Sequence, residues 1–349
     1  MLLKNDFKYK QYYTIDILKF IMALCVVAIH TDPVRLIEDT NIYIIYRSIV
    51  KMAVPFFFIA TGFLLADKIS HNNNTFEKIG SHIKKLLKIY ILWNIIYMPL
   101  AVYHYYDLNY SVLHSVLDYI RGFIFIGEHY NSYILWYILS SIYALIFILL
   151  LVKCKFDSKS MLICGCIIWI IAYTFTLYTQ DIISVPNVID KGLSLLVKII
   201  VSGRIFMGFF YIPLGIFLYE HKTDNIMIGI ILFVISFVLN IISPETGYIY
   251  EAGRILGTTG IFIAALNIKL KYSDIYGTLR EMSSTIYFIH LWIWTIIYAI
   301  IYREKTYGLL PFVMTASISC LVAYIFRRYK LFKKADMLFN WISEKLCYK

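Results

Sequence analysis

Two ionisable residues, Lys19 and His30, stand in an otherwise apolar stretch that is long enough to cross a membrane. At about 100° per residue, eleven positions make three helical turns, so both side chains would leave one helix face about 16 Å apart. A titratable side chain inside a bilayer is costly and usually marks a functional site. Imidazole titrates near neutral pH and can take a proton from a hydroxyl group, which makes His30 a candidate general base.

A group of basic residues is expected at the Lys19 end of that helix, on the cytoplasmic side. Its members are Lys84, Lys85, Lys88 and Arg280, with the acidic Asp16 at the same depth. Lys85 and Lys88 are one turn apart and share a helix face. These side chains either anchor the spans among lipid headgroups or hold the phosphates of a nucleotide-bearing donor. The deep position of Lys19 favours the second interpretation.

A further group of charged residues is expected near the opposite, outer side. Its members are Arg47, Lys51, Arg204, Glu251 and Arg254. The spacing of Glu251 and Arg254 also fits a simple intrahelical ion pair. The free-energy cost of charged side chains that face lipid would be prohibitive. We therefore expect these side chains to face one another or a water-filled cavity in which an acceptor could bind.

A second histidine within an apolar segment, His290, shares a helix face with Tyr287, and Ser284 lies further back on the same segment. An isolated histidine of this kind can simply hydrogen-bond two helices together. Asp32 follows His30 by two positions, which on a helix points away from it, so the spacing does not predict a His–Asp pair.

The composition excludes a soluble globular protein and predicts an all-α, polytopic membrane bundle. Of the 349 residues, 60% are hydrophobic and only 16% are charged, and the mean hydropathy is +0.70. About ten spans are expected, at 15–36, 43–66, 84–104, 132–152, 160–179, 202–219, 225–243, 249–268, 283–302 and 308–327. Two non-spanning stretches stand out: a polar inner loop near 67–83 and an outer stretch, 105–131, whose residues 111–120 fit an amphipathic or re-entrant element.

The net charge of +11 reflects membrane topology and does not indicate nucleic-acid binding. Most lysines and arginines outside the spans fall in alternate segments, which predicts that both termini face the cytoplasm. We expect one membrane domain over 1–349, with a cytoplasmic N-terminus (1–14) that lacks a cleavage site and a basic cytoplasmic tail (328–349) on the inner leaflet. The six cysteines have no metal-binding spacing, so no metal is predicted.

Several of these residues fall in motifs that resemble the acyltransferase-3 family of bacterial integral membrane acyltransferases. The Lys19-x10-His30 pair is similar to the family's Arg/Lys-x10-His motif. Segment 54–65 resembles its PFFF…SGFLL element, with Thr61 in place of serine, and 84–90 resembles its RRxxRI segment, with lysine in place of arginine. Later landmarks follow in the same order at 135–137 (which includes Trp136), 215–218 and 284–290. Within the family, the chain most resembles the membrane half of VanT-type serine racemases, without the racemase domain that follows there.

The resemblance implies an integral membrane O-acetyltransferase of the bacterial plasma membrane, with acetyl-CoA or another acyl-CoA as co-substrate. Lys85, Lys88 and Arg280 would hold the CoA phosphates and Lys19 would stand at the donor entrance. His30 would activate a hydroxyl of a cell-surface polysaccharide, a lipid-linked sugar, a cell-wall precursor or a serine-like acceptor, by direct attack or through an acyl-enzyme. The Lys-for-Arg changes replace bidentate phosphate contacts with point charges.

Two other interpretations remain open from the sequence. The VanT-like segments and the charges within the spans also fit a transporter of serine or another small polar solute, although the helix breaks and inverted repeats common in transporters are not evident. In the remaining one, the polar residues only lock the helices together.

Overall fold

The computed structural model describes residues 12–329 except positions 36, 38, 72–73 and 244–245. All regular elements in this part of the chain are helices. In the first half they are α1 (Tyr13–Thr31), α2 (Thr40–Val50), α3 (Ala53–Ser70), α4 (Thr75–Asp107), α5 (Val112–Arg121), the π-helix η1 (Gly122–Ile126), α6 (Leu135–Lys153) and α7 (Ser158–Thr179). In the second half they are α8 (Asn187–Ile199), the 3₁₀-helix η2 (Gly203–Phe206), α9 (Met207–Glu220), α10 (Ile226–Ile242), α11 (Tyr248–Asn267), α12 (Asp274–Ile297), the π-helix η3 (Tyr298–Tyr302) and α13 (Leu309–Arg328).

The helices confirm a polytopic membrane bundle. Among the described residues, eight helical stretches are long and apolar enough to cross a bilayer, and α2 with α3 counts as one of them. The other two expected spans fall on less regular structure. The span expected at 202–219 corresponds to η2 and α9, which follow α8 after a 77° bend. The span expected at 225–243 is the shorter α10. The basic tail at 328–349 and the N-terminus at 1–14 lie largely outside the described residues.

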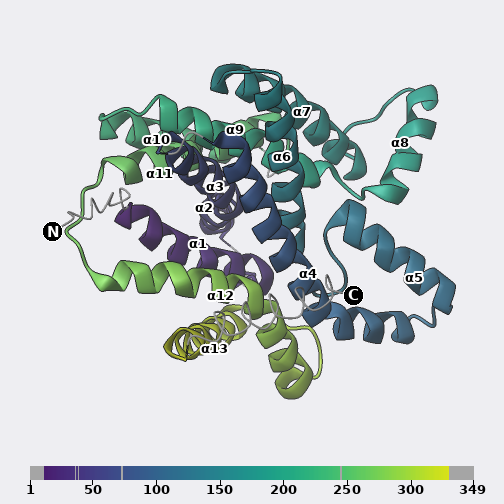
Figure 1. The fold of residues 1–349 in the computed structure, drawn as a ribbon. Helices are drawn as coiled ribbons and strands as arrows, with labels where there is room; N and C mark the ends of the chain where they lie inside the picture. Colours follow the sequence, from purple (N-terminus) through teal and green to yellow (C-terminus); the bar gives the residue numbers. More distant parts are fainter. Residues whose placement is uncertain (1–11, 36, 38, 72–73, 244–245, 330–349) are drawn as a thin grey trace, which may run out of the picture.

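Helix α1 contacts α12, α3 and α13 (Figure 1). The Phe-rich start of α3 supplies the centre of the core, where Phe56, Phe58 and Phe63 are fully buried. Helix α9 then approaches α3 closely, because a Cβ atom on Gly62 would lie 2.0 Å from the carbonyl oxygen of Ile212. Only a residue without a side chain fits there, which accounts for the glycine in the segment that follows the phenylalanines.

The loop predicted near 67–83 is mostly helical in the structure. Helix α3 continues to Ser70 and α4 already begins at Thr75, where the side chain of Asn74 accepts a hydrogen bond from the Glu77 amide. The prediction was wrong because polar, lysine-rich sequence is also helical when an N-cap starts it and water surrounds it. With 33 residues α4 is about 50 Å long, whereas the hydrocarbon layer is about 30 Å thick.

The amphipathic element expected at 111–120 is confirmed as α5. Its apolar face, which includes Val112, Leu113 and Leu117, is exposed. Helix α8 has the same amphipathic character, and the two are tied together because Arg121 donates a hydrogen bond of 2.9 Å to the Lys198 carbonyl oxygen. Both lie beside the main bundle (Figure 1).

Candidate functional site

His30 lies in the last turn of α1, and three contacts fix the backbone of that turn. Asp32 caps the helix with its backbone in the left-handed conformation, and its amide donates to the Ala28 carbonyl oxygen. The Tyr46 hydroxyl donates to the same oxygen at 2.8 Å, and the Gly308 amide donates to the Thr31 oxygen at 2.8 Å. Carbonyls that would otherwise lack partners at the helix end are therefore satisfied, and His30 is presented from a fixed position.

The second histidine, His290 of α12, faces His30. The two ring centroids are 5.3 Å apart, and the ring of Tyr133 also stacks on His30, with a centroid separation of 6.3 Å. His290 is fully buried, and its Nδ1 lies 3.1 Å from the Ile286 carbonyl oxygen. Because a carbonyl only accepts, Nδ1 carries the proton in the neutral ring and Nε2 is left as an acceptor. That Nε2 has no hydrogen-bond partner among the described residues.

A cavity of about 230 Å³ opens beside His30 and brings much of the expected outer group together. Its lining residues are Val26, Ile29, His30, Lys51, Val54, Pro55, Tyr133, Ile134, Trp136, Arg204, Met207, Arg254 and Tyr287. Lys51 stands at the junction of α2 and α3, with its Nζ 5.2 Å from the ring centroid of Tyr250. Arg47 does not line the cavity and lies over Tyr43.

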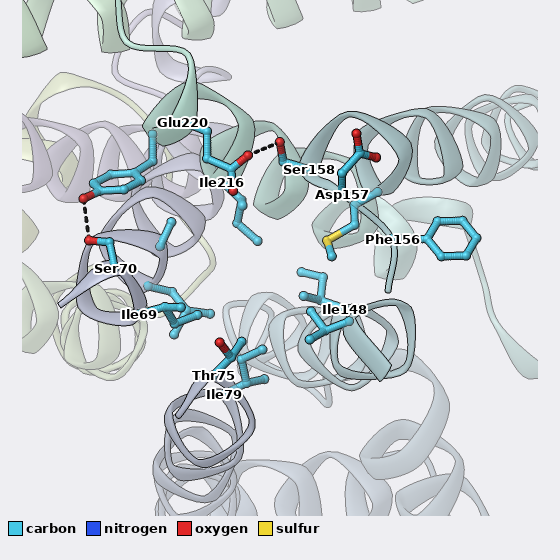
Figure 2. Close-up of a pocket in the computed structure, with 15 residues that line it drawn as sticks. Ile69, Ser70, Thr75, Ile79, Ile148, Phe156, Asp157, Ser158, Ile216 and Glu220 are labelled. Atoms are coloured by element: carbon cyan, nitrogen blue, oxygen red, sulfur yellow. Dashed lines mark hydrogen bonds between the residues drawn. The ribbon is translucent and has the colours of Figure 1, made fainter. Parts of the chain in front are cut away.

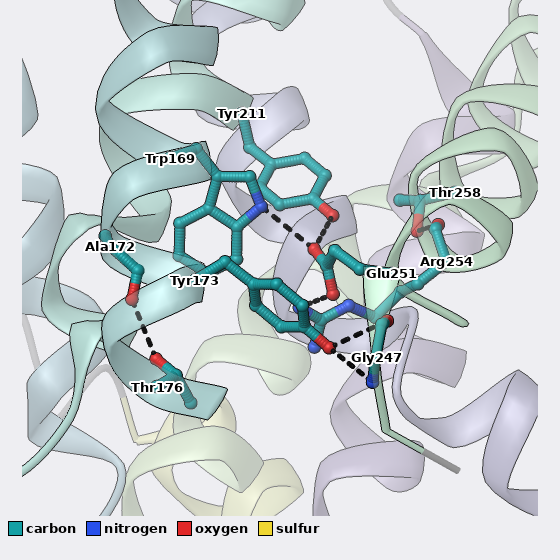
Figure 3. Close-up of polar contacts among 9 residues, drawn as sticks. All are labelled: Trp169, Ala172, Tyr173, Thr176, Tyr211, Gly247, Glu251, Arg254 and Thr258. Carbon is teal, nitrogen blue, oxygen red and sulfur yellow. Dashed lines mark hydrogen bonds and ion pairs between the residues drawn. The ribbon is translucent and has the colours of Figure 1, made fainter. Parts of the chain in front are cut away.

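Arg254, which lines this cavity, is paired with Glu251 (Figure 3). The two form a buried ion pair within α11, as their spacing allowed. Glu251 Oε1 also accepts hydrogen bonds from Trp169 Nε1 of α7 at 3.0 Å and from the Tyr211 hydroxyl of α9 at 3.3 Å. The pair is therefore the centre of a three-helix network, and not only an intrahelical contact.

Arg204 has a comparable partner that the sequence reading missed. It forms an ion pair with Glu128, and its guanidinium carbon lies 5.4 Å from the ring centroid of Trp136. Burial raises the pKa of the Glu128 carboxyl, and the adjacent guanidinium opposes that rise. Glu128 lies in the connection between η1 and α6, where no pattern indicated which residue it would meet.

At the other end of α1, Asp16 and Lys19 lie beside Arg280. The Arg280 Nη1 is 3.3 Å from Asp16 Oδ2, and Lys19 is within electrostatic range of both groups and of Lys68. Lys68 in turn lies within range of Lys85. The structure thus groups Lys19, Arg280 and Lys85 at one end of the bundle, but Arg280 is partly engaged by an acidic partner.

The remaining expected residues are more dispersed. Lys84, Lys85 and Lys88 are exposed on the part of α4 that precedes its buried length. The Thr61 hydroxyl lies 3.2 Å from that of Tyr137, and neither residue lines the cavity. Tyr287 donates to the Ile134 carbonyl oxygen at 2.8 Å. The exposed Ser284 bonds to the Glu281 carbonyl oxygen of its own helix and takes no part in the site.

A larger cavity of about 360 Å³ lies where α3, α6 and α9 end and α4 and α7 begin (Figure 2). Aliphatic side chains such as Ile69, Ile148 and Ile216 form most of its wall. Its polar edge contains the Ser158 hydroxyl, which donates to Glu220. None of the residues expected at the site lines this cavity, so the donor-side lysines and Arg280 do not converge on it.

Comparisons with known proteins agree with the motifs. The acyltransferase-3 family model, described as an acyltransferase domain, matches residues 12–328. An amino-acid racemase of Enterococcus faecalis is 36% identical over 156 residues, which are 45% of this chain and 21% of that protein. A serine/alanine racemase of Enterococcus gallinarum is 33% identical over 108 residues, 30% of this chain and 16% of that protein. The chain spans about a fifth of the length of these curated relatives, and no solved structure matches it.

The family match begins before the first turn of α1 and extends to the end of α13. It therefore includes both histidines and every residue that lines the His30 cavity. On this evidence the chain belongs to the acyltransferase-3 family.

Proposed function

We propose that this chain is an integral membrane O-acyltransferase that moves an acyl group, acetyl in the simplest case, from acyl-CoA to a hydroxyl of an acceptor. The observation that carries the proposal is the position of His30, which lines a cavity together with cationic side chains, while its helix begins near Lys19 and Arg280. One helix thus connects a site suited to an anionic donor with a site suited to proton transfer. Family membership supports acyl transfer as the chemistry.

His30 would act as the general base. The acceptor oxygen attacks the thioester carbonyl carbon while its proton passes to His30. The carbon–sulfur bond then breaks, the CoA thiolate leaves, and the imidazolium returns the proton to sulfur, which gives an ester and free CoA. The ring of His290 lies beside His30, and its Nε2, which is left as an acceptor, would accept a hydrogen bond from the charged ring.

The donor would enter from the cytoplasmic side. Lys85 and Lys88 stand on the exposed part of α4 and would meet the CoA phosphates as point charges, with Lys19 further along the path. The Asp16–Arg280 contact fits a donor site whose acidic residue orients the arginine before the donor arrives. Under this topology the His30 cavity opens on the extracytoplasmic side of the bacterial plasma membrane. The acceptor would then be a cell-surface glycan, a lipid-linked sugar or a cell-wall precursor.

Binding of labelled acetyl-CoA to the purified full-length protein tests the donor half of the proposal. Lys85→Ala with Lys88→Ala should weaken binding, because two phosphate contacts are lost. Lys153→Ala with Lys155→Ala is the matched control, since these exposed lysines lie on the same expected side at the end of α6. Wild-type protein that does not bind acetyl-CoA would overturn the enzyme assignment.

The catalytic half is tested with His30→Ala, which should lower acyl transfer by about 10²–10⁴-fold. Acetyl-CoA binding should be unchanged, because His30 lies about three helical turns from Lys19. A variant that retains full transfer activity would remove His30 from the mechanism.

Transport of serine or another small polar solute is a second candidate, and the racemase relatives favour it. Proteoliposomes that contain the purified chain would accumulate labelled serine under this alternative. Uptake that His30→Ala leaves unchanged would support transport over acyl transfer.

A further inference from the structure

The wall of the His30 cavity has an unusual charge balance. Three of its residues carry a positive charge: Lys51 from the α2–α3 junction, Arg204 from η2 and Arg254 from α11. None of the lining residues is acidic. These cations come from separate parts of the fold, so their convergence is a property of the assembled bundle and not of one helical stretch.

The carboxylates that pair with the two arginines are not among the residues that line the cavity. Glu251 bonds to Trp169, Tyr211 and Arg254 and lies outside the lining (Figure 3). Glu128 pairs with Arg204 and also lies outside it. A guanidinium has five N–H donors, and one ion pair uses only part of them. The carboxylates therefore orient the arginines and leave the cationic groups as the charged surface that a ligand meets.

We propose that the acceptor carries an anionic group, a phosphate or a carboxylate, close to the hydroxyl that is acylated. This inference rests on the proposed acyl transfer and narrows its acceptor class. The anionic group would contact Lys51, Arg204 and Arg254 while the hydroxyl lies against His30. Because the three cations and His30 line one small cavity, the anionic group and the hydroxyl would lie close together in the acceptor.

The chemistry of the cavity distinguishes acceptors by charge. An anion in a partly buried site gains from nearby cations, and planar guanidinium groups bind phosphate and carboxylate with two parallel hydrogen bonds. A neutral polyol of the same shape gains neither contact. A quaternary amine would be repelled, although Tyr133 and Trp136 offer it aromatic faces.

Protection of His30 from chemical modification tests anion binding without any acyl-transfer assay. Diethyl pyrocarbonate modifies neutral imidazole, and mass spectrometry of the peptide that contains His30 follows the rate. The full-length protein is treated with inorganic phosphate, sn-glycerol 3-phosphate, glycerate or glycerol, at an ionic strength held constant with NaCl. At about ten times its Kd, a bound anion should slow modification roughly tenfold, whereas glycerol should not.

Two variants locate the bound anion. Lys51→Gln removes one cation, and the double variant Arg204→Gln with Glu128→Gln removes an ion pair without leaving a buried charge alone. Lys191→Gln, on exposed α8, is the control. Protection that weakens in the first two and persists in the control supports the proposal.

The proposal is overturned if phosphate, glycerol 3-phosphate and glycerate protect wild-type His30 no better than NaCl. It is also overturned if protection persists in both Lys51→Gln and the Arg204/Glu128 double variant, since the anion then binds elsewhere. A preference between glycerol 3-phosphate and glycerate identifies phosphate or carboxylate as the recognised group. Because no donor takes part, failure here leaves the acetyl-CoA binding result intact and so separates this inference from the proposed function.

Discussion

Replacement of Glu251 by alanine is expected to be strongly destabilising, and the structure allows its size to be estimated. The side chains of Glu251 and Arg254 are only 6% and 15% exposed, so solvent would not replace the lost partner. A buried charge that loses its partner costs about 3–5 kcal/mol. Trp169 and Tyr211 would lose their common acceptor, at about 1–3 kcal/mol for each unsatisfied group. Because these costs overlap, we expect a total loss of about 4–5 kcal/mol.

A double-mutant cycle separates the ion pair from the rest of the network. Glu251→Gln keeps an acceptor for Trp169 and Tyr211 but removes the charge, so it should recover part of the loss. Glu251→Ala combined with Arg254→Met removes both charges and should be less destabilising than Glu251→Ala alone, with a coupling of about 2–3 kcal/mol. Thermal unfolding in one detergent, followed by the fluorescence of the six tryptophans, gives the comparison.

The reasoning is refuted if Glu251→Ala lowers stability by less than about 1 kcal/mol, which is the average effect of a single substitution. It is equally refuted if the double variant is as unstable as the sum of the two single variants, because the charges would then act independently.

Three further predictions address packing, catalysis and pH. Gly62→Ala should lower the free energy of unfolding by about 1–3 kcal/mol, because the new Cβ would lie 2.0 Å from a backbone oxygen of α9. Chemical unfolding measures this loss, and an unchanged stability would mean that α9 moves away at no cost. His290→Ala should lower acyl transfer about tenfold with unchanged acetyl-CoA binding, and His290→Gln should restore part of it by offering an acceptor; equal losses in both would assign His290 to packing alone. His129 stacks on Tyr119, and burial lowers the pKa of His129 to about 4. Between about pH 6.5 and pH 4 the histidine is protonated in the unfolded chain but neutral in the folded protein, so the free energy of unfolding falls as the pH drops through this range. Above about pH 6.5 His129 causes no such loss. The loss should be smaller in His129→Phe, as chemical unfolding at several pH values will show.

Much of the fold follows from the sequence because crossing a bilayer imposes a minimum apolar length. Ten spans were expected, and each corresponds to a helix or a helix pair among the described residues. The exceptions have local causes. The span at 202–219 follows a 77° bend after α8, and Gly203, at the start of the span, lies close to the Ala172 carbonyl oxygen; hydropathy carries no information about either feature. The start of α4 was mistaken for a loop because polarity was equated with irregular structure, although an N-capped polar segment also forms a helix.

The site was predictable in its residue types and less so in its partners. His30, Arg204 and Arg254 were expected at one depth, and they do line one cavity. Trp169 lies 82 positions from Glu251 and Tyr211 lies 40 positions from it, so no local spacing links them. The roles proposed for the donor-side lysines remain predictions, because surface exposure alone does not distinguish a phosphate contact from a lipid anchor.

The length of α4 gives the protein a natural place for a reporter group. About 20 Å of this helix exceeds the thickness of the hydrocarbon layer, and Gly80 lies in its first turns with open space around its Cα. A cysteine introduced there could carry a fluorophore without displacing any neighbour. Lys85 follows little more than one turn later, so such a label would register the arrival of a large anionic molecule through a change in its emission. The same rigid extension would thus turn donor binding into an optical signal that can be followed in real time, one molecule at a time.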